Sequence, residues 1–188
     1  DAAGAVRQIA YAVRTAEAAG EPYLEAFAHS FHARLAAVGH DRQAARAAAA
    51  RAAGIAEEYG FPLLAAHAAI PLGWAQAGLG EPEAGLATIE RGLAALDRSG
   101  QRILAPFHRG LQAEVVLALD DPETALALLD DALAESAARG GGFETPGLHH
   151  VRAVALDALG QGARAREARH AAATVAREQG ACAREAGS

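Results

Sequence analysis

The sequence predicts an all-α fold in which antiparallel helix pairs stack into a superhelix with a period of 40 residues. Ala supplies 54 of the 188 residues, and Ala favours helices and disfavours strands. In the stretch 86–96, large apolar residues recur at intervals of three and four, which places them on one face of a helix. Such a stripe cannot be buried by one helix pair alone, so neighbouring pairs must stack. Gly recurs every 40 residues, at Gly20, Gly60, Gly100, Gly140 and Gly180.

Each repeat is predicted to contain two helices. The second helix of each pair is expected over 42–59, 82–98, 122–138 and 162–179, and 2–19 matches such a helix without its partner. Asp121-Pro122-Glu123 is a typical start, because Asp caps a helix, Pro suits its first turn and Glu faces the positive end of its dipole. Each second helix is expected to end at a Gly in a left-handed cap. The first helix is expected over 22–38, 62–78, 103–119 and 145–159.

These spans divide residues 1–188 into one array that is cut in mid-repeat at both ends. The partial repeats are 1–20 and 181–188, and the complete repeats are 21–60, 61–100, 101–140 and 141–180. Solenoids carry polar capping repeats, and none is recognisable here. We therefore expect a segment of a longer protein, with the free-standing array as the alternative. The apolar stripe of 2–19 is expected to be exposed and to favour self-association.

Charge and hydropathy exclude several classes of function. The net charge is −6, and all 17 basic residues are Arg without forming a basic stripe, so nucleic-acid binding is not expected. No apolar run reaches the length of about 18–20 residues that spans a membrane, and no signal peptide is recognisable. We expect a cytoplasmic protein. The absence of Lys and Asn beside abundant Ala, Gly and Arg indicates G+C-rich coding and a bacterial source.

The helix pairs resemble tetratricopeptide repeats (TPRs). Small residues in this family allow the paired helices to approach closely, around a Gly-Asp turn that is followed by an Ala and a large apolar residue. The third complete repeat shows the pattern as Ala113, Asp120-Asp121, Ala125, Leu129 and Ala132-Leu133. The second shows it as Leu72-Gly73, Gly80-Glu81, Gly85, Ile89 and Gly92-Leu93.

The period departs from the TPR length of about 34 residues. Longer repeats of this kind are similar to those at the C-terminal end of LuxR-type and maltose-regulator-like transcription activators and of ATPase-coupled adenylate cyclase-like proteins. Leu72-Gly73-Trp74-Ala75 and the stretch 176–181 are typical of that group. The resemblance implies a sensing or autoinhibitory arm beside an ATPase module.

No enzymatic activity, cofactor or metal site is expected. The sequence has no G-x-S-x-G elbow and no His-Glu-x-x-His motif. The adjacent His149 and His150 would point about 100° apart on a helix. The run 140–142 has no preceding strand and no following Lys-Ser/Thr, so it is interpreted as a loosened helix cap. The lone Cys182 is interpreted as a surface thiol.

The candidate binding site is a groove lined by the first helices, as the TPR resemblance implies. Repeat register places aromatic and charged residues there, and such residues commonly anchor protein interfaces. Packing between helices is the alternative for Phe27, Phe107 and Trp74. Pro71, inside the helix 62–78, is expected to kink it just before Trp74. The groove candidates are Phe27, Ser30, Arg34, His67, Ile70, Trp74, Phe107, Gly110, Glu114 and His150. Gly147 and Val154 occupy equivalent positions in the fourth complete repeat.

Two functional hypotheses follow. The first is a protein-interaction module that binds a protein or peptide, including domains of its own parent chain, as the regulatory arm of a larger bacterial signalling or transcription-regulatory protein. The alternative is a sensor in which a ligand or peptide shifts the curvature of the array and controls an attached ATPase, cyclase or DNA-binding module. A sensor should enclose a pocket with convergent polar groups, whereas an adaptor should show an open surface.

Overall fold

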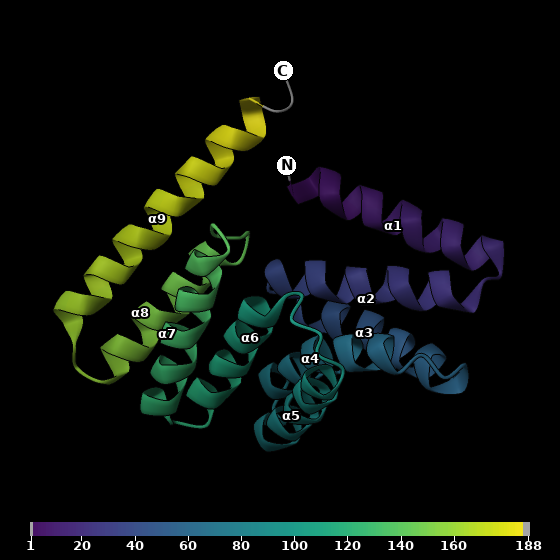
Figure 1. Ribbon diagram of the computed structural model, residues 1–188, viewed down its shortest axis with the longest axis horizontal. Coiled ribbons are helices and arrows are strands. Elements are labelled where there is room, and N and C mark those ends of the chain that lie inside the picture. Colours follow the sequence, from purple (N-terminus) through teal and green to yellow (C-terminus); the bar gives the residue numbers. More distant parts are fainter. Residues whose placement is uncertain (1, 186–188) are drawn as a thin grey trace. The chain divides into compact units, whose positions relative to one another are not determined.

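The computed structural model describes the backbone of residues 2–185 and the side chains of residues 4, 5 and 7–180. Every regular element in this part of the chain is a helix, as the sequence predicted (Figure 1). The helices are α1 (Ala2–Ala19), α2 (Pro22–Val38), α3 (Arg42–Glu58), α4 (Pro62–Gly78), α5 (Pro82–Arg98), α6 (Ala105–Ala118), α7 (Pro122–Ala138), α8 (Thr145–Ala158) and α9 (Gly162–Glu185).

The chain forms two compact units. Unit 1 spans Asp1–Ile103 and contains α1 to α5, and unit 2 spans Leu104–Ser188 and contains α6 to α9. Ala is the commonest buried apolar residue in each unit. In unit 1 the buried residues Ala33, Ala48 and Ala49 join α2 to α3. In unit 2 the buried residues Ala153, Leu156, Ala165 and Ala168 join α8 to α9.

Aspartate side chains cap the start of two helices, and the cap at Asp121 was predicted. Asp121 accepts a hydrogen bond from the Thr124 backbone N–H at 3.0 Å at the start of α7. Its hydrogen bonds with Thr124 hold the pKa of the Asp121 carboxyl below its usual value. Asp41 caps α3 in the same way, accepting from Ala44 N–H at 2.9 Å. Local sequence therefore determines where these helices begin.

The glycines that recur every 40 residues cap helices as predicted at four of the five positions. Gly20, Gly60, Gly100 and Gly140 have φ between 67° and 86°, as a left-handed cap requires. Gly180 was expected to end the last helix, and this expectation is wrong, because α9 continues to Glu185. The following residues 181–185 contain neither Pro nor Gly that would stop it. The proposed partial repeat 181–188 includes residues 186–188, which lie outside the described chain.

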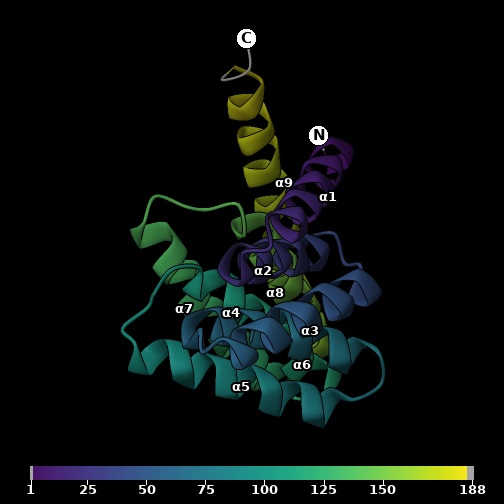
Figure 2. The same cartoon turned by 90° about the vertical axis from the view of Figure 1, so that its right-hand side faces the viewer.

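Helix α4 packs on α5 (Figure 2), and their close approach depends on glycine. A Cβ added to Gly85 would lie 2.4 Å from the carbonyl oxygen of Gly73, and one added to Gly73 would lie 2.3 Å from that of Gly85. A Cβ added to Gly92 would lie 2.9 Å from the carbonyl oxygen of Ala66. The small residues that carried the TPR resemblance thus bring two backbones into contact.

The terminal helix α1 does not expose its apolar stripe. Ile9 and Ala16 are buried as α1 packs on α2. The expectation that this stripe is exposed was therefore wrong, and with it the reason for predicting self-association through α1. Tyr11, on another face of α1, is exposed.

Candidate functional site

A cluster of exposed aromatic rings lies on one face of α2. Tyr23, Phe27 and Phe31 are spaced four residues apart, so they form one line along the helix, and they are 53%, 49% and 46% exposed. The ring centroids are 6.5 Å apart for Tyr23 and Phe27 and 6.2 Å for Phe27 and Phe31. We call these three residues the aromatic strip. Sequence reasoning selected only Phe27, although the four-residue spacing of all three was visible in 22–38.

Neighbouring residues extend the strip at both ends. At one end, Phe61 packs edge-on against Tyr23 with centroids 5.3 Å apart, and it stacks on the exposed Tyr59 at 6.3 Å. At the other end, the Arg34 guanidinium carbon lies 3.8 Å from the centre of the Phe31 ring. This distance is well within that of a cation–π contact.

Three further groove candidates lie beside the strip and stay partly exposed. Ser30 and Arg34 are on the same face of α2, and His67 is on α4. Burial lowers the pKa of His67, and the nearby positive charge of Arg34 lowers it further. Burial also lowers the pKa of Arg34 from its usual value. The predicted groove residues Phe27, Ser30, Arg34 and His67 therefore form one surface.

Trp74 is not a groove residue. Its exposed fraction is 0%, so the prediction that it projects into the groove is wrong. The Arg42 guanidinium lies 3.4 Å from the ring centre, and Arg42 Nη1 donates a hydrogen bond to the Trp74 carbonyl oxygen at 2.6 Å. His40 covers another side, with ring centroids 6.1 Å apart. The turn between α2 and α3, together with the start of α3, thus covers this ring.

Three more candidates are also buried, which corrects their assignment. Ile70 is completely enclosed in unit 1. Phe107 is buried and contacts Phe143, with centroids 5.6 Å apart. A Cβ at Gly110 would lie 2.7 Å from Leu148 Cδ2, so α8 covers that position. Glu114 is partly exposed, and Gly147, His150 and Val154 are exposed on α8.

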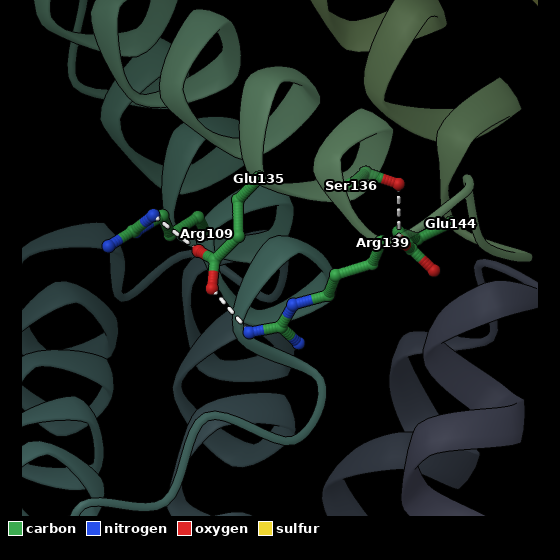
Figure 3. Close-up of polar contacts among 5 residues, drawn as sticks. All are labelled: Arg109, Glu135, Ser136, Arg139 and Glu144. Atoms are coloured by element: carbon green, nitrogen blue, oxygen red, sulfur yellow. Dashed lines mark hydrogen bonds and ion pairs between the residues drawn. The ribbon is translucent and has the colours of Figure 1, made fainter.

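Unit 2 contains a polar network on α6, α7 and the loop after α7 (Figure 3). Glu135 of α7 accepts from Arg109 Nη1 of α6 at 2.8 Å and from Arg139 Nη2 at 2.6 Å. Ser136 donates to Glu144 Oε1 at 2.8 Å and lies 3.0 Å from the Thr145 hydroxyl. The loop after α7 is therefore tied to the helices on either side of it. Gly140 and Gly141 have positive φ there, which confirms the interpretation of a loosened cap.

A second polar group joins α1 to α2. We call Glu17 of α1 and Glu25 and His29 of α2 the α1–α2 cluster. One ligand atom from each lies within 4.8 Å of the other two. No metal site is expected from the sequence, and these three residues were not among its candidates. The four-residue spacing of Glu25 and His29 was a visible signal, but the approach of Glu17 from another helix was not.

Three remaining features do not point to a binding or catalytic site. A surface hollow on α1 is lined by Gly4, Arg7, Gln8 and Tyr11, all from one helix, so it is not enclosed. Within the described residues, no helix combines the length and apolar character that crossing a bilayer would require. The side chain of Cys182 lies outside those the structure describes.

Comparison with known proteins supports the fold alone. No protein-family model matches the chain, and no curated protein matches it. Among solved structures, it is similar to the nearly identical TPR-like repeats of a kinesin light chain-like protein of Podosopora anserina. A single-substitution variant of those repeats has a TM-score of 0.57 at 16% identity, over 95% of this chain and 88% of that one. A second structure of them gives 0.53 with the same identity and coverage. The chain therefore has a TPR-like helical repeat fold.

Proposed function

We propose that this chain is a protein-interaction module that binds a peptide segment of a partner along the aromatic strip. The observation that carries the proposal is the line of three half-exposed rings on α2. Contiguous exposed apolar surface is uncommon in folded proteins and commonly marks an interaction site. Aromatic residues supply much of the binding energy at protein interfaces, because they bury a large area with little loss of side-chain entropy.

The strip also indicates the chemistry of the peptide. Apolar side chains of the partner would lie against Tyr23, Phe27 and Phe31. The cation of Arg34, stacked on Phe31, favours a carboxylate close to them. The proposed ligand is therefore a segment with apolar residues followed or preceded by Asp or Glu.

An open adaptor surface fits these features better than a sensor pocket. The strip is exposed along its length, and the hollow on α1 is lined by one helix only. A small-molecule site would need polar groups converging from several directions. Binding is thus proposed to be the activity of this chain, with no chemistry of its own.

Two segments of the sequence also bear on the kind of protein in which this module acts. The resemblance of 72–75 and 176–181 to the arms of bacterial LuxR-type and cyclase-like regulators supports a role as the cytoplasmic regulatory segment of such a protein. The peptide would then come from another domain of the same protein or from a separate partner.

The test begins with selection of peptides from a random displayed library on the immobilised full chain. Selected peptides should share apolar residues and an acidic residue. A synthetic peptide from that set should bind the Phe27→Ala and Phe31→Ala variants at least about tenfold more weakly than wild type, the size expected for anchor residues. The Arg34→Gln variant should lose the preference for the acidic residue.

Tyr11→Ala is the matched control, because it removes an exposed ring of α1 outside the strip. It should bind like wild type, and circular dichroism should show the same helix content in all variants. Equal binding by wild type and both strip variants would refute the proposed site. Failure to select any peptide would count against the function itself.

A further inference from the structure

A divalent-cation site is suggested by the α1–α2 cluster, which lies on a different face of α2 from the aromatic strip. On the helix, Glu25 and His29 are one turn apart and point to the side that α1 covers. Glu17 approaches them from the last turn of α1. Two carboxylates and an imidazole are typical ligands of zinc in proteins.

His29 supplies the independent observation. It is only 9% exposed, and neither of its ring nitrogens makes a hydrogen bond. Buried polar groups are normally hydrogen-bonded, and the contact of Nε2 with Glu17 at 3.4 Å leaves this imidazole without a well-formed hydrogen bond. A metal ion that accepts a nitrogen lone pair would satisfy it.

The distance between two of the three ligand atoms fits such an ion. His29 Nε2 lies 3.4 Å from Glu17 Oε1, longer than a well-formed hydrogen bond. Two ligands that each lie about 2.1 Å from a tetrahedral zinc ion are about 3.4 Å apart. The pair is therefore separated by the edge length of a zinc tetrahedron.

The surrounding charges orient the cluster. Arg51 donates from Nε and Nη2 to Glu25 Oε1, at 3.0 Å and 2.5 Å, which fixes that carboxylate and leaves Oε2 for an ion. Carboxylates that ligate metals are commonly held by such outer contacts. Glu17 stands at the C-terminal end of α1, where the helix dipole disfavours a negative charge, so a cation would compensate it.

We propose that Glu17, Glu25 and His29 bind one zinc ion, with water completing its coordination, and that the ion ties the terminal helix α1 to α2. The inference is independent of peptide binding, because it uses none of the strip residues. Its expected effect is local: α1 packs on α2 as its neighbour in unit 1, so an ion bridging them should slow the opening of α1.

The test uses the full chain stripped of metal with a chelator and then titrated with zinc ions against a chromophoric competitor. Wild type should bind one equivalent. Glu17→Gln should bind at least about tenfold more weakly, since changes at metal sites typically cost this much or more. Its fold should be retained, because Glu17 is exposed. His29→Gln should show the same loss.

Glu21→Gln is the matched control, because it removes a nearby exposed carboxylate outside the cluster. It should bind zinc like wild type. Hydrogen exchange of α1 amides should slow on adding zinc to wild type and to Glu21→Gln, and remain unchanged in Glu17→Gln. Absence of saturable binding, or a full equivalent retained by Glu17→Gln, would overturn the proposal and leave an ion pair between Glu17 and protonated His29.

Discussion

At the scale of single residues, burial separates the aromatic side chains into two classes with different roles. Phe27 and Trp74 occupy comparable places on first helices, and both were candidates for the groove. Phe27 is half exposed, whereas Trp74 is covered by His40 and Arg42. The difference arises because the turn after α2 folds over Trp74, a contact between residues more than 30 positions apart.

Replacing Trp74 with Ala should therefore destabilise unit 1. Removing a fully buried indole typically costs about 3–5 kcal/mol, because it removes apolar contacts and leaves a cavity. Chemical denaturation followed by circular dichroism should show a lower midpoint. Phe27→Ala is the comparison, since it removes an exposed ring, and its midpoint should change little. A Trp74→Ala variant as stable as wild type would contradict the structure.

At the scale of the element, the pairing of α4 with α5 is limited by backbone contact. Gly73 and Gly85 face each other so closely that neither has room for a methyl group. Glycine within a helix normally weakens it relative to Ala. Here that local loss is offset by the close approach of the two helices, which explains why glycine stands in both.

Gly85→Ala and Gly54→Ala should change stability in opposite directions. A Cβ at Gly85 would meet the Gly73 carbonyl oxygen, so the helices must separate, at a cost of about 1–3 kcal/mol. Gly54 of α3 has no atom within 4 Å of such a Cβ, so Ala there should stabilise the helix by about 0.5–1 kcal/mol. Thermal or urea unfolding would compare them. A shift of the same sign in both variants would argue against tight packing at Gly85.

At the scale of the whole molecule, each unit has its own buried core and its own partly buried histidine of lowered pKa. Burial and the charge of Arg34 lower the pKa of His67 in unit 1. Burial and the charge of Arg152 do the same for His149 in unit 2. His32 in unit 1 is lowered by burial and by His29, against an opposing effect of Asp41. Protonation of these rings thus opposes folding in both units.

Acidification should accordingly destabilise the protein. The unfolded histidine has a pKa of 6.5, and the folded one is lower, so below pH 6.5 the unfolded state binds more protons. Stability is fully present above that pH and falls as the pH drops towards the folded pKa. The single Trp lies in unit 1. Its fluorescence would report the midpoint of urea denaturation of that unit at a series of pH values between 7 and 5.

His67→Gln should make this fluorescence midpoint less dependent on pH. His149→Gln serves as the control, because it alters unit 2 and should leave the fluorescence response as in wild type. An equally steep response in wild type and His67→Gln would show that His67 titrates alike in the folded and unfolded chain.

The sequence by itself determined the all-α class, the helix boundaries apart from the end of α9, and the glycine caps at four of the five predicted positions. Those features depend on contacts within a few residues: Asp121 caps its own helix, and Gly20, Gly60, Gly100 and Gly140 adopt the conformation that their own turns require. The close approach at Gly73 and Gly85 was also anticipated, because the repeat pattern places small residues at equivalent positions.

Only the tertiary structure decided which side chains are available to a partner. Repeat register placed Ile70, Trp74, Phe107 and Gly110 on the side of their helices expected to line the groove. Neighbouring helices and turns cover all four. The same limit hid the α1–α2 cluster, because Glu17 meets His29 only when α1 packs on α2. Burial and ligand geometry depend on contacts between distant residues, which helical periodicity within one repeat does not specify.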